Sequence, residues 1–311
     1  MDSKNSTTVE IQGWLNIDKP AGMTSYQVIA RLKRLTGRCR IGHAGTLDPL
    51  ATGVLPVALG TATRTVEYLH KVPKTYLAVI ELGITTETYD AEGRVTATAD
   101  SSAITRAAVE KALTPFIGNI EQIPPIYSAL KQNGRPLYEM ARRGEVVEVK
   151  ARPVTIYSID VFDFLSSLVT VNVECGGGTY IRSLAHDLGQ VLGVGAHLKD
   201  LRRTHYGGFD IKQAIELNSL QSLDDVVAKI LPVDTALTDL QTLELDETSA
   251  AKIICGVVTP EVMERLVGKH AYRLYRENGE LLAIADMTGE ELRLKVFETF
   301  TSKERNLLTL L

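Results

Sequence analysis

The chain has no hydrophobic run that approaches 18 residues, few aromatic residues and only three cysteines among 311 residues. The absence of a long apolar run excludes an ordinary transmembrane helix. Cys39, Cys175 and Cys255 lie far apart and outside any CxxC or Cys/His pattern, which excludes a recognisable disulfide framework or zinc site. Residues 1–10 are polar and carry no signal of secretion or import. We therefore expect a cytoplasmic globular protein with free thiols, no metal and no membrane partner.

The sequence also lacks an overall basic charge, because 34 Lys and Arg face 38 Asp and Glu. The charge is unevenly distributed. Residues 1–210 hold 23 basic and 21 acidic side chains, whereas residues 211–311 hold 11 and 17. The basic residues gather in three clusters: Arg31, Lys33, Arg34, Arg38 and Arg40; Lys131, Arg135, Arg142, Arg143, Lys150 and Arg152; and Lys199, Arg202, Arg203 and His205. Local clusters of this kind contact phosphates, with solvated surface as the alternative.

The most specific stretch is Gly-Thr-Leu-Asp-Pro-Leu-Ala-Thr-Gly at residues 45–53, preceded by Gly42-His43-Ala44. It sets one carboxylate, Asp48, on an apolar segment, and Pro49 keeps that residue out of helical geometry. An isolated Asp-Pro pair is ordinarily a turn. The residues alone thus leave a structural turn and a reactive carboxylate as alternatives.

Four motifs in order resemble those of the TruB family of pseudouridine synthases. They are residues 15–25 (Leu-Asn-Ile-Asp-Lys-Pro-Ala-Gly-Met-Thr-Ser), the Asp48 stretch, Lys74-Thr75-Tyr76, and Gly178-Thr179-Tyr180-Ile181-Arg182. The resemblance implies that Asp48 is the nucleophile, that Arg182 keeps it charged and that Tyr76 stacks on the target uracil. It also implies that Tyr180 and Leu201 line the pocket and that His43 fills the place of the flipped base.

The resemblance implies isomerisation of uridine to pseudouridine at position 55 in the T-loop of tRNA. The reaction moves the glycosidic bond from N1 to C5 of uracil, so it requires no redox step, and we expect no cofactor and no guide RNA. Asp48 has three possible actions: abstraction of a ribose proton, attack at C1′, or addition at C6. The sequence does not choose among them.

Three other interpretations remain open. The chain is the catalytic subunit of an RNA-guided pseudouridylase, a non-catalytic RNA-binding or RNA-folding protein, or a carboxylate hydrolase with Asp90 or Asp187 as the second acid. Leu50, where the guided branch typically has a basic residue, favours the stand-alone type without an obligatory protein partner. The intact set of Asp48, Tyr76 and Arg182 favours catalysis.

The resemblance implies an α+β pseudouridine synthase fold in residues 1–240, with a mixed, mostly antiparallel sheet, flanking helices and a central cleft. Residues 124–152 form a basic and aromatic insertion, predicted to bind RNA and to hold a short helix at 138–143. Residues 241–311 are predicted to form a small, β-rich, PUA-like domain from apolar pieces at 257–263, 271–275, 281–287 and 292–297. Expected contacts to the RNA backbone are Lys131, Arg142, Arg143, Lys150, Arg202 and Arg203.

Hydrophobic periodicity places the local elements. Strands are predicted at 11–17, 75–82, 94–98, 153–163 and 168–175, and helices at 25–35, 105–113 and after residue 180. Thr24 or Ser25 is a suitable cap for the first helix, and Gly37 is placed to end it. Gly176-Gly177-Gly178 is more typical of a strand-to-helix turn than of a phosphate-binding loop.

Overall fold

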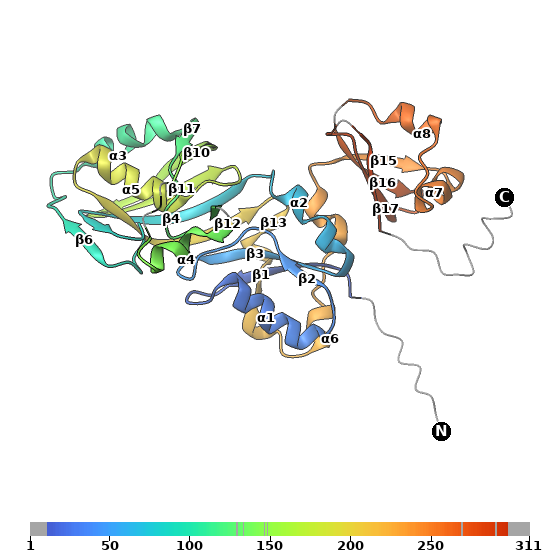
Figure 1. The fold of residues 1–311 in the computed structure, drawn as a ribbon, viewed down its shortest axis with the longest axis horizontal. Helices are drawn as coiled ribbons and strands as arrows, with labels where there is room; N and C mark the ends of the chain where they lie inside the picture. The colour runs from blue at the N-terminus through green and yellow to red at the C-terminus, as the bar shows by residue number, and fades with distance from the viewer. Residues whose placement is uncertain are drawn as a thin grey trace, which may run out of the picture.

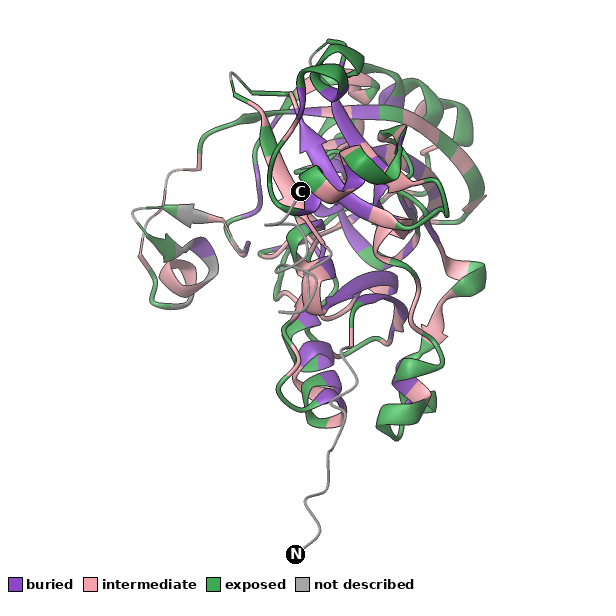
Figure 2. Cartoon of the chain, turned by 90° about the vertical axis from the view of Figure 1, so that its right-hand side faces the viewer, coloured by how far each residue is buried: buried purple, intermediate pink, exposed green. Residues whose placement is uncertain are grey.

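The computed structural model describes residues 11–297, apart from Ala129, Asn133, Val146, Glu148, Lys269 and Glu290 and the side chains of Lys131, Pro136, Tyr138 and Arg142. A large ten-stranded sheet with its helices forms the main body, and a smaller module with its own sheet follows at the C-terminal end (Figure 1). Buried residues run through both sheets, whereas the outer faces of the helices are exposed (Figure 2). Within the described residues, no helix is long and apolar enough to cross a membrane.

The large sheet is mixed and mostly antiparallel, as predicted. Its strands lie in the order β14 (Ile215–Glu216), β1 (Gly13–Lys19), β3 (Thr52–Leu59), β12 (Ala196–Tyr206), β4 (Lys74–Leu82), β11 (Leu168–Cys175), β10 (Arg152–Leu165) and β7 (Gly118–Gln122). β2 (Ile41–His43) adds to β3, and β13 (Phe209–Asp210) adds to β12. Within this sheet, the β1–β14 and β3–β12 pairings are parallel and the other described pairings are antiparallel.

The parallel β3–β12 pairing joins the two halves of the sheet through two residue pairs, Thr52–Arg202 and Gly53–Arg203. Gly53 has a φ of +98°, and a Cβ there would lie 2.2 Å from the Arg203 carbonyl oxygen. Glycine is thus required for the two backbones to approach. The pairing places the start of β3, which forms the end of the Asp48 stretch, at the centre of the sheet.

Helices cover the sheet where the sequence predicted them. α1 (Ser25–Thr36) begins with a capping box of Thr24 and Gln27 and ends at Gly37. α3 (Arg106–Leu113) and α5 (Ile181–Leu192) pack on each other beside the other half of the sheet (Figure 1). Shorter elements are α2 (Val66–Leu69), α4 (Leu137–Arg142), α6 (Leu223–Val227), the pairs β5 (Ile84–Thr86) with β6 (Val95–Thr98) and β8 (Lys131–Gln132) with β9 (Arg135–Pro136), and 3-10 turns at Gly60–Arg64, Thr114–Phe116, Ile211–Gln213, Leu217–Ser219 and Val233–Leu237.

The C-terminal module has a four-stranded sheet in the order β15 (Gln241–Leu245), β16 (Ala271–Arg276), β17 (Leu281–Asp286) and β18 (Arg293–Val296). α7 (Glu247–Ile254) and α8 (Pro260–Arg265) pack with it around a separate apolar core. The module is β-rich, as predicted, but the apolar piece at residues 257–263 contributes to the helix α8 and forms no strand. Thr259 caps α8 and Pro260 occupies its first turn, where proline favours a helix.

Candidate active site

The loop that carries Asp48 lies between β2 and β3 and is held on two sides. The Ser25 hydroxyl accepts a hydrogen bond from the Leu47 amide at 3.0 Å and donates to its carbonyl oxygen at 3.2 Å. Arg203 Nη2 donates to the Gly45 carbonyl oxygen at 3.1 Å. These contacts fix the backbone on the N-terminal side of Asp48, which suits a residue that must act in one geometry.

Lys19, at the end of β1, holds the other side of the loop. Its side chain is fully buried, and Nζ donates to the carbonyl oxygens of Pro20 at 2.9 Å, Met23 at 2.6 Å and Pro49 at 3.3 Å. Burial lowers the pKa of Lys19 to about 8, although the Asp48 charge opposes the shift. The first motif of the sequence thus supports the second, a role that the sequence did not predict.

Arg182, in the first turn of α5, lies between two carboxylates. Its Nε is 2.9 Å from Asp48 Oδ2, and its Nη1 is 3.2 Å from Asp90 Oδ2. Nη2 donates to the carbonyl oxygen of Tyr127 at 3.0 Å. The guanidinium is 6% exposed, so solvent screens these charges little. The predicted pairing of Arg182 with Asp48 is present in the structure.

Asp90, which the sequence offered only as the second acid of a hydrolase, is a site residue that holds Arg182. It is buried, and its Oδ1 accepts hydrogen bonds from the Thr88 hydroxyl at 2.5 Å and the Glu92 amide at 3.1 Å. One carboxylate oxygen therefore faces the turn and the other faces Arg182. The sequence Asp-Ala-Glu-Gly is typical of a turn, and nothing local indicates that α5 approaches it.

The Asp48 side chain remains 35% exposed, although Arg182 holds one of its oxygens. No hydrogen bond to Oδ1 is found among the described residues. Burial raises the pKa of Asp48 above its ordinary value, Asp90 adds to the shift, and the charges of Arg182 and Lys19 oppose it. The site therefore presents a carboxylate with one free oxygen, whose ionised form is disfavoured by burial and favoured by the charges of Arg182 and Lys19.

Tyr76 and Leu201 lie on the adjacent strands β4 and β12 and belong to the same apolar cluster as Leu47. They are 8% and 6% exposed. Burial raises the pKa of Tyr76, so its phenol stays protonated near neutral pH. Together these side chains offer one apolar wall next to the carboxylate, as predicted for a base-binding pocket.

Tyr180 precedes α5 and is half-buried. The buried Gln122 side chain fixes its backbone, accepting from the Tyr180 amide at 2.8 Å and donating to its carbonyl oxygen at 3.0 Å. His43 ends β2, and burial followed by the Arg203 charge lowers its pKa, so the imidazole is neutral at pH 7. A neutral flat ring at this edge is compatible with the predicted plug role.

The expected RNA-backbone contacts lie in different environments. Arg143 and Lys150 are exposed on the insertion, and the side chains of Lys131 and Arg142 lie outside the described residues. Arg202 is 38% exposed and pairs with Asp18 at 2.6 Å. Arg203 is 1% exposed and its Nε donates to the Val54 carbonyl oxygen at 2.6 Å. Arg203 therefore supports the Asp48 loop from inside, in contrast to the surface role expected for it.

The described residues contain no group of three or more His, Cys, Asp or Glu side chains arranged to hold a metal ion. The functional groups gathered around Asp48 are two carboxylates, two buried cations and aromatic walls. This combination suits acid–base or nucleophilic chemistry on a flat, polar ring.

Comparison with known families and proteins agrees with this geometry. Residues 33–181 match the family model described as TruB family pseudouridylate synthase (N terminal domain), and residues 182–238 match tRNA pseudouridylate synthase B C-terminal domain. The chain is also 44% identical over 277 residues to the tRNA pseudouridine synthase B of Dehalococcoides mccartyi strain BAV1, covering 88% of this chain and 92% of that protein. The chain belongs to the TruB family of pseudouridine synthases. It is an isomerase.

Other TruB relatives and solved structures extend the likeness. The tRNA pseudouridine synthase B of Clostridium kluyveri is 39% identical, with 93% of this chain and all of that protein covered. The crystal structure of a Cbf5-Nop10-Gar1 complex contains a chain with a TM-score of 0.68 and 26% identity, covering 94% of this chain and 86% of that one. A structure of an H/ACA RNP bound to a substrate RNA contains a chain with a TM-score of 0.67 and 25% identity, with the same coverage. The pseudouridine synthase fold expected from the sequence is confirmed.

Proposed function

We propose that this TruB protein converts uridine to pseudouridine at position 55 in the T-loop of tRNA, with Asp48 as the nucleophile and without a cofactor or guide RNA. The observation that carries the proposal is the ion pair of Asp48 with Arg182, itself held by Asp90. The relatives at 39–44% identity are tRNA pseudouridine synthase B proteins, which supports tRNA as the substrate. The chains in the Cbf5 and H/ACA structures are less similar in sequence, at 25–26%.

The reaction requires rearrangement without net oxidation. The C1′–N1 bond breaks, a C1′–C5 bond forms, the proton at C5 leaves, and a proton is gained at N1. Asp48 Oδ1 is the reacting atom, because Arg182 holds Oδ2. The Arg182 charge stabilises the carboxylate in the resting enzyme, and Asp90 with the Tyr127 carbonyl fixes the guanidinium against movement during the reaction.

The uridine must leave the RNA stack to reach Asp48. Extrusion costs a few kcal/mol, which contacts in the pocket offset. Tyr76 supplies an aromatic face and Leu201 an apolar contact, and Tyr180 closes the wall. His43 occupies the vacated position in the RNA, where a neutral ring stacks without the cost of desolvating a charge.

The insertion at residues 124–152 is proposed to hold the RNA by its phosphates, and the module from residue 241 to be PUA-like. Arg143 and Lys150 are exposed on the insertion. Its base is bonded to the active site, because Ser183 Oγ donates to the Ile123 carbonyl oxygen at 2.7 Å and Arg182 donates to that of Tyr127. RNA seated on the insertion is thereby placed next to the catalytic arginine.

The deciding experiment is incubation of the purified protein with unmodified tRNA, in the absence of any guide RNA or second protein, followed by mapping of pseudouridine at nucleotide resolution. We expect one modified position, 55, and none with Asp48→Asn. Modification that requires an added guide would replace this proposal with the RNA-guided alternative. Tight binding without modification would favour a non-catalytic RNA-binding protein.

A further inference from the structure

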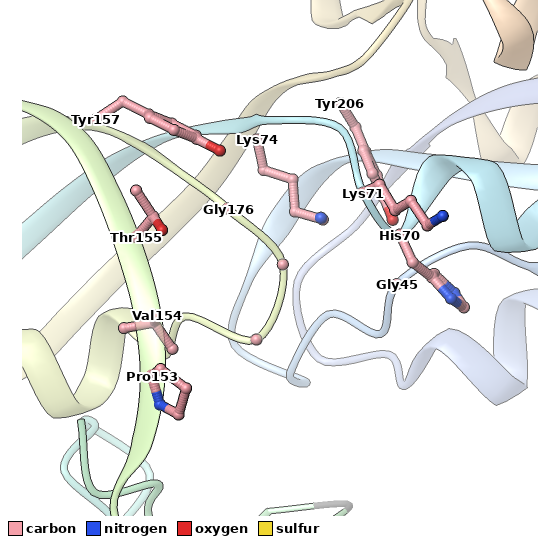
Figure 3. Close-up of a pocket in the computed structure, with 12 residues that line it drawn as sticks. Gly45, His70, Lys71, Lys74, Pro153, Val154, Thr155, Tyr157, Gly176 and Tyr206 are labelled. Atoms are coloured by element: carbon pink, nitrogen blue, oxygen red, sulfur yellow. The ribbon is translucent and has the colours of Figure 1, made fainter. Parts of the chain in front are cut away.

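A hollow lies beside Gly45 of the Asp48 stretch, between the end of β12, the segment before β4 and the strand β10 (Figure 3). Its volume is about 480 Å³. Its polar lining comes from His70, Lys71, Lys74, Thr155, Tyr157 and Tyr206, and the turn 176–178 forms part of the wall. The hollow shares its elements with the active site, since Lys74 lies two residues before Tyr76 on the same face of β4.

Lys74 is a buried cation without an anionic partner. Its side chain is 7% exposed, and its Nζ makes one long hydrogen bond, to the Val72 carbonyl oxygen at 3.3 Å. Among the described residues, no carboxylate forms an ion pair with it. The ammonium group therefore has N–H donors to spare, and Figure 3 shows it reaching into the hollow between the Gly176 turn and Tyr206.

Tyr206 adds an unused donor to the same place. The residue is fully buried, and its hydroxyl has no hydrogen-bond partner within the part of the chain that the structure describes. Lys74 Nζ lies 4.3 Å from the centre of its ring, and the Arg203 guanidinium carbon lies 4.9 Å from it. A buried hydroxyl without a partner costs free energy, which a ligand with acceptor oxygens would recover.

The charges around the hollow are of one sign. Lys71 is exposed at its rim, and Lys74 and Arg203 are buried behind it. Burial, with the Arg203 charge adding to it, lowers the pKa of Lys74 to about 8, although Cys175 opposes the shift. Two cations share a buried region that no described carboxylate neutralises, so an anion bound there would offset their mutual repulsion.

The glycine turn keeps the hollow open. A Cβ on Gly177 would lie 2.5 Å from the His70 carbonyl oxygen and 3.6 Å from Lys74 Nζ. A side chain at this position would therefore collide with the backbone and occupy the space in front of the ammonium group. The bare backbone leaves room for a ligand to approach Lys74.

We propose that this hollow binds one backbone phosphate of the RNA substrate, with Lys74 Nζ and the Tyr206 hydroxyl as its donors. The proposal rests on the proposed function, because it takes the bound RNA as the source of the phosphate. The two non-bridging oxygens of a phosphodiester share one negative charge, so the group can accept from both donors and neutralise the unpaired ammonium. Because Lys74 and Tyr76 share a face of β4, the phosphate would belong to a nucleotide next to the extruded uridine and would hold the strand in the opened form.

The test is a double-mutant cycle between the enzyme and its RNA. Asp48→Asn protein, which does not turn over, is titrated with T-arm hairpins that carry a neutral methylphosphonate at one linkage at a time around the target uridine. The cycle is repeated with Lys74→Met added, a change that keeps the length of the side chain and removes its charge. At one linkage, we expect the methylphosphonate to weaken binding to the Asp48→Asn protein about tenfold. The same methylphosphonate should not weaken binding to the protein that also carries Lys74→Met.

A first variant controls for the loss of a positive charge, and a second tests the rim of the hollow without a change in the buried core. Lys111→Met removes an exposed charge on α3, and every methylphosphonate should weaken its binding as it does for the parent. Lys71→Met, at the exposed rim, should reduce the effect at the same linkage without disturbing the core. Independent, additive effects of Lys74→Met and every methylphosphonate would overturn the proposal, as would coupling of equal size in the Lys111 control.

Two further measurements distinguish this proposal from a site for free anions and from a failure of the proposed function. If inorganic phosphate raises the melting temperature of the parent but not of Lys74→Met, while all linkages behave additively, the hollow takes a free anion and the RNA proposal is overturned. Catalysis is assayed separately with the Asp48 enzyme on the unmodified hairpin and on whole tRNA. Turnover with additive cycles leaves the proposed function intact and removes only the phosphate subsite, whereas absence of pseudouridine in both RNAs removes the proposed function itself.

Discussion

At the scale of single residues, Asp48 combines a chemical requirement with a cost in stability. Its pKa is raised in the folded protein, chiefly by burial, so its ionised form is less favourable there than in the unfolded chain. This cost is absent at low pH, where the carboxyl is protonated, and develops as the pH rises through its ordinary value of 3.8 and beyond.

Asp48→Asn is therefore expected to abolish pseudouridine formation and to raise the melting temperature at pH 7. The amide keeps the shape of the carboxyl group but carries no charge to desolvate. The gain over the parent should shrink as the pH falls towards 4, because the parent carboxyl then becomes neutral as well. Thermal melts of both proteins across this pH range provide the measurement, and a destabilised Asn variant at pH 7 would contradict it.

Arg182→Met should slow the reaction by about 100-fold or more, the effect of removing one charged donor from a preorganised site. The pKa of Asp48 should rise further without its counter-charge, so the acid limb of the pH–rate profile should move to higher pH. Arg182→Lys should restore part of the rate, because it returns the charge but not the planar fork that spans Asp48 and Asp90. Single-turnover rates against pH decide the matter. An acid limb that stays in place would show that the ion pair is not functional.

The residues found from the sequence were those inside contiguous motifs. Asp48, Tyr76 and Arg182 each carry neighbours that restrict their backbone, so their surroundings identify them. Asp90 and Gln122 have no such context, since their partners are 92 and 58 residues away in the chain. Their importance arises only when α5 packs beside the turns that hold them, which local patterns do not encode.

At the scale of elements, the parallel pairing of β3 with β12 should tolerate no side chain at Gly53. Gly53→Ala forces a φ of +98° on an L residue and brings a methyl group against the Arg203 carbonyl oxygen. We expect a loss of about 3 kcal/mol or more in the free energy of unfolding. Gly37→Ala is the matched control, because Gly37 also has a positive φ but open space around it, and should cost only the backbone strain of about 1 to 3 kcal/mol. Equal losses in denaturant titrations would show that the close approach is unimportant.

The insertion should govern affinity more than chemistry. Neutralising its two exposed cations, Arg143→Gln with Lys150→Gln, should weaken RNA binding and lower the slope of log affinity against log salt by about 1 to 2. The rate at saturating RNA should change much less, since Arg182 bonds to the Tyr127 backbone and not to these side chains. Arg94→Gln with Lys111→Gln, exposed on other elements, serves as the control pair. An unchanged salt slope in the insertion variant would assign phosphate binding elsewhere.

Helices and strands followed their hydrophobic period almost throughout the main body. The predicted and observed ends of α1 agree to within one residue, because a capping threonine marks its start and a glycine marks its end. The C-terminal module was harder, because its apolar pieces are too short for period to separate strand from helix. There Pro260 at the start of α8 indicates a helix, whereas the apolar residues that follow it are equally typical of a strand.

At the scale of the whole molecule, a polar contact fastens the C-terminal module to the main body. Asp286 is 1% exposed and accepts from the Tyr68 hydroxyl at 3.3 Å and from Arg293 Nη2 at 2.7 Å. Burial acts to raise its pKa, but hydrogen bonds from Thr288 and the Arg293 charge outweigh burial and hold the pKa below its ordinary value. Its contribution to stability is present above about pH 3.8 and lost as the pH falls through the folded pKa.

Asp286→Asn should thus lower the stability of the module at pH 7, with little effect on the main body. Calorimetry is expected to show the transition of the module separating from that of the catalytic part. The difference from the parent should disappear in acid, below the folded pKa, where the parent carboxyl is neutral too. A single unchanged transition at pH 7 would show that Asp286 does not couple the two parts.

The pairing of β3 with β12 through two residue pairs also determines when the main sheet can form during synthesis. Asp48 leaves the ribosome early, yet the strand that completes its surroundings ends at Tyr206, and β1 pairs with β14 only after residue 215. Contacts across such long stretches of chain slow folding, because a large loop must close before they form. During translation, the parts of β1 and β3 that pair with β14 and β12 are therefore uncovered until about two-thirds of the chain is made. This interval is the period of greatest risk of aggregation and of need for a chaperone.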